Sequence, residues 1–216
     1  MLKIERFVNE LMSSNCYVVY DEDTKRCLVI DPGSEKSQRE IEFIEKNNLS
    51  LDYIIITHEH TDHNWGVNAL VARYSDAKVV CSEACKQNLK KEYRAYFLFY
   101  YDNTDYHYRV CDIDLTTENL NWNLDWAGNN VKFIAAPGHS MGSICIEING
   151  ILFTGDAILQ SKPHINKRNG SIDLFYETAG RLRNCFPSNE LIYPGHGETF
   201  PLCEYIVPEK NPKREL

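Results

Sequence analysis

The chain has 216 residues, of which 43% are hydrophobic, and a formal net charge of −8 at pH 7. We expect one domain spanning residues 1–216, and the acidic balance argues against nucleic acid as the main partner, because phosphate binding favours a basic face. The sequence shows neither a signal-peptide pattern nor an apolar run near the ~20 residues of a membrane span, so we expect a cytoplasmic protein without a membrane partner.

Hydrophobic patterning predicts strands in runs that are broken by helices. In chain order, the expected strands are Leu2–Val8, Cys16–Tyr20, Cys27–Ile30, Tyr53–Thr57, Ala77–Cys81, Val131–Ala136, Ser143–Ile148, Ile151–Thr154 and Glu190–Tyr193. The expected helices are Ser37–Asn48, Trp65–Tyr74 and Ile172–Cys185. Asn149-Gly150 is a strong signal for a tight hairpin between two of these strands. The pattern predicts mixed sheets, with helices outside two packed sheets.

Two segments stand apart from this pattern. The segment Tyr93–Tyr108 contains eight aromatic residues, and Asp112–Asn130 is polar.

The eight cysteines are scattered through the chain without a CxxC pair. Because we expect a reducing compartment, we interpret the cysteines as free thiols of the core.

The segment Thr57–His63, which reads Thr-His-Glu-His-Thr-Asp-His, concentrates metal-ligand residue types. It directly follows the apolar run Tyr53–Ile56, and His58, His60, Asp62 and His63 fall within six residues. Such a density of imidazoles at the end of a buried strand is hard to explain as packing. It is typical of half of a two-metal site, so the rest of the chain must supply the other half.

Three further strand ends supply residues of the same kind. His139, Asp156 and His196 each follow a predicted strand, and each is preceded by a glycine. Glycine lets the backbone turn sharply, so it can aim the next side chain off the strand end. The repetition of this design at several strand ends predicts one shared site. His107 and His164 lack that context, and we interpret both as ordinary surface or pocket residues.

The resulting set contains five histidines and two aspartates, a combination that zinc, iron and manganese all accept. His58 and His60 can point to one metal, while Asp62 and His63 can reach a second. A carboxylate such as Asp156 can bridge two ions. Two metals ~3.5–4 Å apart hold a hydroxide, lower its pKa and polarise a carbonyl or phosphoryl oxygen.

With these motifs the sequence resembles the metallo-β-lactamase superfamily, and within it the glyoxalase II-like hydrolases. Segments similar to family motifs are Asn15-Cys16-Tyr17, Ile30–Gly33, Thr57–His63, Pro137–Ser143, Gly155-Asp156, Pro194–Gly197 and Glu209–Pro212. The resemblance implies a four-layer αββα sandwich of mixed α/β class, with the metals at one sheet edge. It also implies a ligand assignment: His58, His60 and His139 for the first metal; Asp62, His63 and His196 for the second; and Asp156 as the bridge. Asp62 would in addition handle the proton during catalysis.

The resemblance leads us to expect a zinc-dependent hydrolase with two zinc ions per chain, iron and manganese being the alternatives. The β-lactamase branches lack the bridging aspartate, so Asp156 argues against antibiotic hydrolysis. Glyoxalase II has a C-terminal helical domain and a glycine loop after its Gly-Asp. We expect neither here, although Lys162, Lys167 and Arg168 can supply positive charge. We therefore expect a small thioester as substrate, and these departures argue against S-lactoylglutathione.

Several alternatives stay open at this point. The same ligands can cleave lactones or phosphodiesters, and related persulfide dioxygenases keep a similar motif around one iron. A non-catalytic protein with a structural metal site is a third class, although structural zinc sites are usually closed and rich in cysteine. The segment Tyr93–Tyr108 is a lid or wall of the active site, an aromatic helix packed on the core, or a homodimer contact, since tyrosine is enriched at interfaces.

Overall fold

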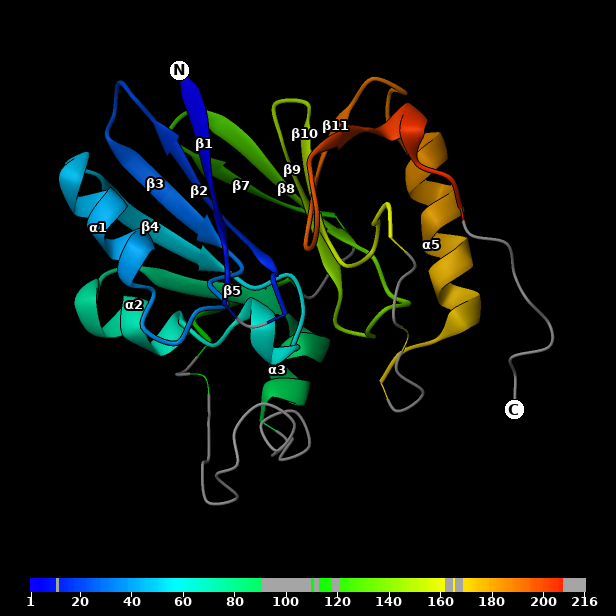
Figure 1. The fold of residues 1–216 in the computed structure, drawn as a ribbon, viewed down its shortest axis with the longest axis horizontal. Helices are drawn as coiled ribbons and strands as arrows, with labels where there is room; N and C mark the ends of the chain where they lie inside the picture. The colour runs from blue at the N-terminus through cyan, green and yellow to red at the C-terminus, as the bar shows by residue number, and fades with distance from the viewer. Residues whose placement is uncertain are drawn as a thin grey trace.

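The computed structural model describes residues 1–10, 12–90, 110, 113–117, 121–161, 165 and 169–207. In this part of the chain, two six-stranded sheets pack against each other between layers of helices (Figure 1). The aromatic segment Tyr93–Tyr108, His107, His164, the cations at 162, 167 and 168, and the motif Glu209–Pro212 lie outside the described residues.

The two sheets contain six consecutive strands each. The first consists of β1 (Leu2–Val8), β2 (Asn15–Asp21), β3 (Arg26–Ile30), β4 (Ser50–Ile55), β5 (Lys78–Ser82) and β6 (Leu115–Thr117), in that order. The second consists of β12 (Phe200–Pro201), β11 (Leu191–Pro194), β10 (Ile151–Gly155), β9 (Ile144–Ile148), β8 (Asn129–Ala135) and β7 (Asn121–Trp126). Both sheets are mixed, because β3 to β6 run parallel in the first and β10 pairs parallel with β11 in the second.

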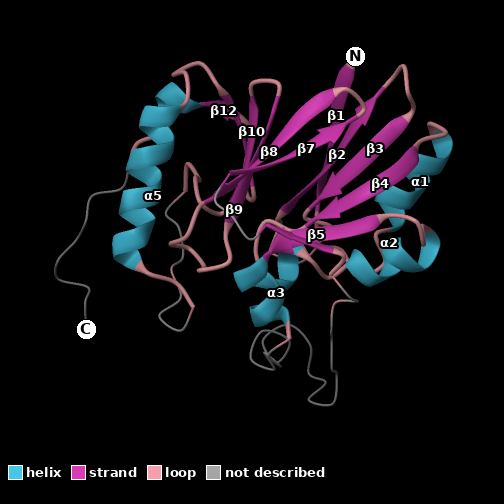
Figure 2. Cartoon of the chain, turned by 180° about the vertical axis from the view of Figure 1, so that it is seen from behind, coloured by secondary structure: helices cyan, strands magenta, loops and turns pink. Residues whose placement is uncertain are grey.

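Helices cover the outer face of each sheet (Figures 1 and 2). The first sheet carries α1 (Gln38–Lys46), α2 (Val67–Arg73) and α3 (Glu83–Leu89), and the second carries α5 (Ile172–Cys185). Two short 3-10 helices, η1 (Thr61–His63) and η2 (Leu202–Glu204), complete the elements in the described residues. No helix described here is long and apolar enough to cross a bilayer.

Three buried clusters define the layers. One lies between the first sheet and its helices and includes Ile44 of α1 and Leu70 of α2. A second lies between the two sheets and contains Tyr17 from one and Phe153 from the other. The third packs Leu182 of α5 against the second sheet. Because successive side chains of a strand point to opposite faces, each sheet supplies two of these clusters. The predicted four-layer αββα architecture is confirmed.

The sequence located most elements but missed some. Helix Ile172–Cys185 and strand Leu2–Val8 match the structure, and the hairpin at Asn149-Gly150 is confirmed, with φ angles of 51° and 79°. The prediction omitted β6, β7, β12 and α3. The polar segment Asp112–Asn130 contains two of these strands and the beginning of β8.

The prediction for the cysteines was partly wrong. Cys16, Cys27, Cys81, Cys85 and Cys145 are free and buried, as expected. Cys185 and Cys203 are free but exposed, because they lie at the end of α5 and in η2 on the outer surface of the second sheet's layer. Cys111 is outside the described residues.

Candidate metal centre

Four strand ends carry the predicted ligand residues and meet at one edge of the sandwich. In the first sheet, β3 and β4 run parallel, and the segment Thr57–His63 follows β4. In the second sheet, β8, β10 and β11 share one direction, because β9 pairs antiparallel with both β8 and β10. His139, Asp156 and His196 follow these three strands. Parallel strands bring their carboxyl ends to the same edge, so residues from both halves of the chain converge there.

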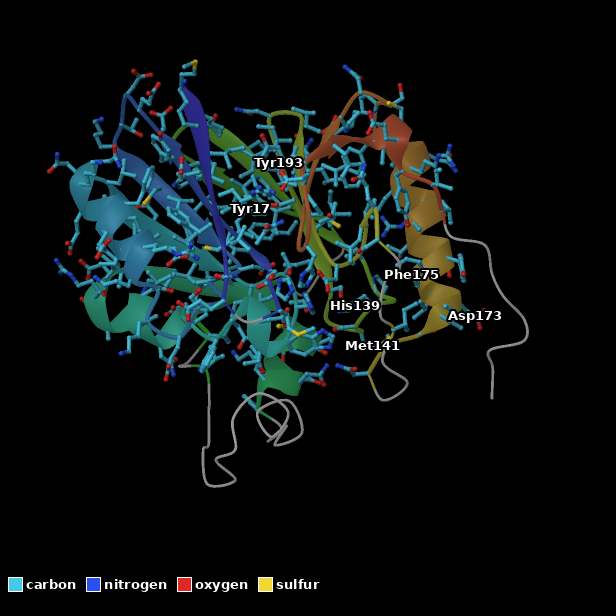
Figure 3. All side chains as sticks on the ribbon, viewed as in Figure 1. Tyr17, His139, Met141, Asp173, Phe175 and Tyr193 are labelled. Atoms are coloured by element: carbon cyan, nitrogen blue, oxygen red, sulfur yellow. The ribbon has the colours of Figure 1, made fainter. Side chains whose placement is uncertain are left out.

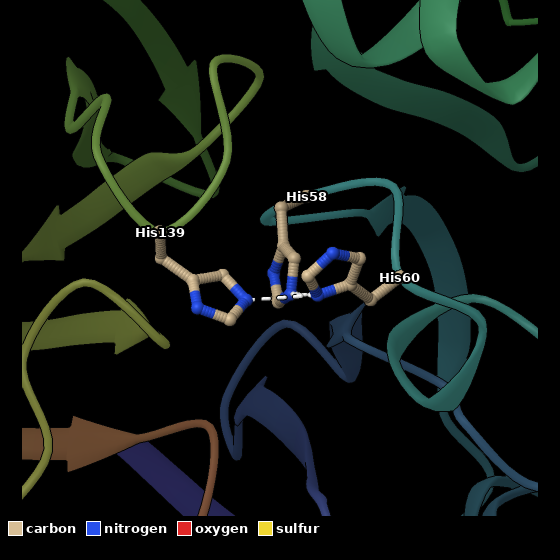
Figure 4. A group of neighbouring side chains, drawn as sticks. All are labelled: His58, His60 and His139. Carbon is tan, nitrogen blue, oxygen red and sulfur yellow. Dashed lines mark hydrogen bonds between the residues drawn. The ribbon is translucent and has the colours of Figure 1, made fainter. Parts of the chain in front are cut away.

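The first ligand group consists of His58, His60 and His139. All three side chains are buried, and their rings converge from two loops (Figure 4). His60 Nδ1 lies 3.1 Å from His58 Nε2 and 2.8 Å from His139 Nε2. A tetrahedral ion with metal–nitrogen bonds of ~2.0–2.1 Å would hold its ligand atoms roughly 3.3 Å apart. The spacing of the three nitrogens therefore fits one metal ion.

The second ligand group consists of Asp62, His63 and His196. Asp62 Oδ2 lies 3.4 Å from Nε2 of His63 and 3.4 Å from Nε2 of His196. The His63 side chain is fully buried, whereas that of His196 is 24% exposed. The second group thus lies nearer to solvent than the first.

Asp156 lies between the two groups. Its Oδ1 is 3.5 Å from His63 Nε2, and its Oδ2 is 3.4 Å from His139 Nε2 and 3.5 Å from His196 Nε2. Asp156 Oδ1 and His63 Nε2 are both buried and have no hydrogen-bond partner among the residues that the structure describes. Buried polar atoms normally have partners, so these two need an explanation, and metal ions held by this donor set would provide one. The residues present therefore fit two metal ions sharing Asp156.

Asp31, at the end of β3, was not assigned a role from the sequence. Its carboxylate accepts hydrogen bonds from the backbone NH of Thr57 at 2.7 Å and from the Thr57 hydroxyl at 2.6 Å, and it lies 2.9 Å from His63 Nδ1. The Thr57 hydroxyl also lies 3.0 Å from His58 Nδ1. Such contacts fix the ring orientation of a ligating histidine. The available signal was an aspartate at a strand end, as at Asp156, but the sequence could not show that it faces the same site.

Burial and charge give the two groups opposite protonation behaviour. Burial lowers the pKa of His58 well below its usual range and that of His60 to about 3, and neighbouring imidazoles add to the effect. Burial also opposes charge on His63 and His196, but nearby carboxylates outweigh it and raise their pKa values to about 9 and about 10. The same histidines hold the pKa values of Asp62 and Asp156 below the usual range, although burial acts in the other direction.

Two of the preceding glycines serve different purposes. Gly155 has a φ of +48°, so the expected turn before Asp156 is present. Gly195 is not in the left-handed region, but a Cβ there would collide with Asp156 Oδ1 and lie 2.8 Å from His63 Cε1. At this position glycine provides space for the site and not a turn.

The β1–β2 hairpin holds the second group from the other side. The Ser14 hydroxyl donates to the carbonyl of Asp62 at 2.5 Å, and the Asn15 side chain donates to the carbonyls of Pro194 and Gly197. The Tyr17 hydroxyl donates to Pro194 as well, from its position beside Tyr193 (Figure 3). Both loops of the second group are therefore fixed to the first sheet.

Comparisons with known proteins agree with the architecture. A family model described as the metallo-beta-lactamase superfamily matches residues 10–196. The chain is 29% identical over 185 residues to a hydroxyacylglutathione hydrolase of Serratia proteamaculans, covering 83% of this chain and 60% of that protein. The chain thus spans about 60% of the length of that relative.

Solved structures show the same fold. The BLEG-1 B3 metallo-beta-lactamase superposes with a TM-score of 0.80 at 23% identity, covering 94% of this chain and 95% of that one. ETHE1 from Myxococcus xanthus superposes with a TM-score of 0.73 at 23% identity, covering 94% and 80%. At this level of identity the two neighbours establish the fold and not the substrate.

Proposed function

The chain belongs to the metallo-beta-lactamase superfamily, and we propose that it is a binuclear metal-dependent hydrolase of a small ester-like substrate, with thioesters as the preferred class. The observation that carries the proposal is the position of Asp156, whose two oxygens lie within 3.5 Å of histidines from both ligand groups. The preference for a thioester is supported by relatives named hydroxyacylglutathione hydrolase.

In this proposal His58, His60 and His139 hold the first metal, and Asp62, His63 and His196 hold the second. Asp156 is shared between the two. Zinc is the preferred ion, and iron and manganese accept the same donors. When bound, two such ions generate hydroxide from water at neutral pH and polarise the carbonyl of the substrate.

The protein's own residues orient this chemistry. Asp31 holds the Nδ1 side of His63, so the Nε2 atom faces the carboxylates of the site. The Asp62 side chain is 16% exposed, so its carboxylate is within reach of solvent, which supports a role as the acceptor of the proton. We therefore assign Asp62 a catalytic role in addition to metal binding.

The remaining expectations follow from charge and size. We propose a small-molecule substrate, a cytoplasmic location, and neither a nucleic-acid nor a membrane partner, in keeping with the net charge of −8. Self-association into a homodimer belongs to the same proposal and is testable by light scattering.

The decisive experiment is a substrate panel. Purified protein loaded with zinc is assayed on a thioester, a lactone and a phosphodiester, and bound metal is counted by mass spectrometry. We expect two zinc ions per chain and the highest kcat/KM on the thioester. The matched control for Asp62→Asn is Asp76→Asn, which removes the same negative charge at an exposed position. Absence of metal-dependent turnover of every compound would refute the proposal.

The second candidate is an oxidoreductase with a single iron, similar to persulfide dioxygenases, and the structural likeness to ETHE1 is compatible with it. Metal analysis separates the two functions. One iron per chain together with oxygen consumption on a persulfide would favour the second candidate, whereas two zinc ions and no oxygen consumption would favour the hydrolase.

A further inference from the structure

Glu59 lies between two residues of the first ligand group and is not part of any ligand group. It is buried, with 7% of its surface exposed. Burial of a carboxylate is costly unless the charge is compensated by partners. Among the residues that the structure describes, no ion pair involves Glu59. Its compensation comes from neutral donors, and each donor belongs to a different part of the chain.

Three hydrogen bonds reach the Glu59 carboxylate. Asn88, at the end of α3, donates to Oε1 at 2.7 Å, and Asn169 donates to the same oxygen at 2.9 Å. The Ser140 hydroxyl donates to Oε2 at 2.6 Å. Hydrogen bonds to charged groups contribute more to stability than those between neutral groups. Glu59 thus connects three segments that are distant from it in sequence.

Two of the three segments are connected to the loop that carries His139. Ser140 follows His139 of the first group, and its hydroxyl also accepts from the NH of Gly142 at 2.9 Å. Asn169 lies between Asp156 and α5, and its carbonyl accepts from the NH of Met141 at 2.7 Å. Figure 3 places His139 and Met141 on one loop near the N-terminal end of α5. The carboxylate therefore fixes the loop of His139 and the segment before α5 in one arrangement.

The Glu59 carboxylate packs closely against the loop of Gly142. A Cβ on Gly142 would lie 2.6 Å from Glu59 Oε2 and 2.7 Å from the NH of Cys85. The Ser82 hydroxyl donates to the carbonyl of Gly142 at 2.6 Å, which connects the same loop to the start of α3. Loss of the carboxylate would therefore leave three donors unsatisfied in a close-packed region.

We propose that Glu59 is a positioning residue that couples the first ligand group to the two segments on either side of it, and thereby sets both metal affinity and substrate affinity. The Ser140 contact holds His139 toward His58 and His60. The Asn88 and Asn169 contacts hold α3 and the residues before α5 against the loop that carries His58 and His60, and the proposal assigns the effect on substrate affinity to these two segments. The effect on substrate affinity rests on the proposed function, whereas the effect on metal affinity does not.

The experiment compares Glu59→Ala with Glu59→Gln. Glutamine keeps both asparagine contacts, because its Oε1 can accept from them, and it replaces the Ser140 contact by a reversed one in which its Nε2 donates to the Ser140 hydroxyl. Zinc affinity is measured by chelator competition, and kcat and KM are measured on the thioester. For Glu59→Ala we expect zinc affinity to fall by about 10–100-fold, the range for residues that orient metal ligands. We also expect KM to rise about tenfold. Glu59→Gln should keep both values within about threefold.

Single-contact variants test the coupling separately. Ser140→Ala should lower zinc affinity with little change in KM, and Asn169→Ala should raise KM with little change in zinc affinity. Ile44→Ala, in the core beneath α1, is the control that lowers the melting temperature without changing either value. Should Glu59→Ala fail to fold, Ser140→Ala and Asn169→Ala still decide the question.

Hydrogen exchange gives a readout that is independent of activity. In Glu59→Ala, peptides covering residues 83–90, 138–143 and 169–175 should exchange faster, and the peptide of α1 should not. The proposal is overturned if Glu59→Ala lowers only the melting temperature, or if Glu59→Gln is as impaired as Glu59→Ala. If the wild-type protein hydrolyses nothing on the panel, the proposed function fails, while zinc affinity and hydrogen exchange still test Glu59.

Discussion

The first ligand group is buried and made of three histidines, whereas the second combines a carboxylate with two histidines and lies nearer to solvent. At neutral pH the low pKa of His60 keeps its imidazole in the uncharged form that binds a metal. The raised pKa values of His63 and His196 mean that a metal must displace protons in the second group. The two halves of one site thus differ in their readiness for metal, and we expect the first group to fill first.

Asp156 contacts both ligand groups, so its replacement should affect both and have the largest effect. We expect Asp156→Asn to lower kcat/KM at least 10³-fold, equivalent to about 4 kcal/mol of transition-state stabilisation. Bound zinc should fall from two ions per chain to about one. Kinetics and metal analysis on the same preparation check this, with Asp76→Asn as the control. Full activity with one zinc would show that the shared carboxylate is dispensable.

Replacing one histidine of each ligand group with alanine tests the metal affinity of the two groups separately. His196→Ala should leave the first metal in place, so the protein should bind one zinc tightly and lose about 10²–10³-fold in kcat, or roughly 3–4 kcal/mol. His139→Ala should instead weaken the tighter of the two sites. Zinc titration against a competing chelator distinguishes them. Equal weakening of both sites in both variants would mean that the groups act as one unit.

Asp31 affects the second group through the orientation of His63. Asp31→Asn should reduce zinc affinity at the second group by about 10–100-fold, the range for residues that hold a ligating histidine. Affinity at the first group should change less, because Asp31 reaches His58 only through the Thr57 hydroxyl. Stepwise zinc titration measures both affinities, and a larger loss at the first group would contradict the assignment.

The smallest effect concerns stability of the metal-free protein against pH. His58 and His60 have lowered pKa values, so the unfolded state binds more protons than the folded state as pH falls below ~6.5, and stability declines. His63 and His196 have raised pKa values, so their contribution is complete below ~6.5 and is lost as pH rises through about 9 and about 10.

The two groups therefore oppose each other, and melting temperature in the presence of a chelator should be highest near pH 6.5. The decline on the alkaline side should be shallower in His196→Ala, which removes one of the raised groups. A melting temperature that rises between pH 7 and pH 9 in the metal-free wild-type protein would contradict this prediction.

Local patterns in the sequence predicted much of the fold, but the prediction missed strand β7 and helix α3, although both have local signals. Residues 121–126 alternate polar and apolar side chains, the pattern of a strand, but the polar composition of the surrounding segment concealed it. The turn after β7 uses Ala127-Gly128, with φ angles of 50° and 75°, and this pair is a weaker signal than Asn-Gly. Helix α3 also has a local signal, because serine is a favoured N-cap residue. In the structure Ser82 caps α3 by accepting a hydrogen bond from the NH of Cys85.

The sequence by itself determined which seven residues come together, because each stands at the end of a strand whose periodicity is local and visible. Only the tertiary structure decided how Asp31 and Glu59 support them, since those contacts join residues far apart in the chain. It also decided the protonation of each group, because a pKa depends on burial and on distances to charges that no spacing in sequence records. The motif Thr57–His63 thus indicated four of the seven candidate ligands, and the packing of the two sheets set the surroundings of all seven.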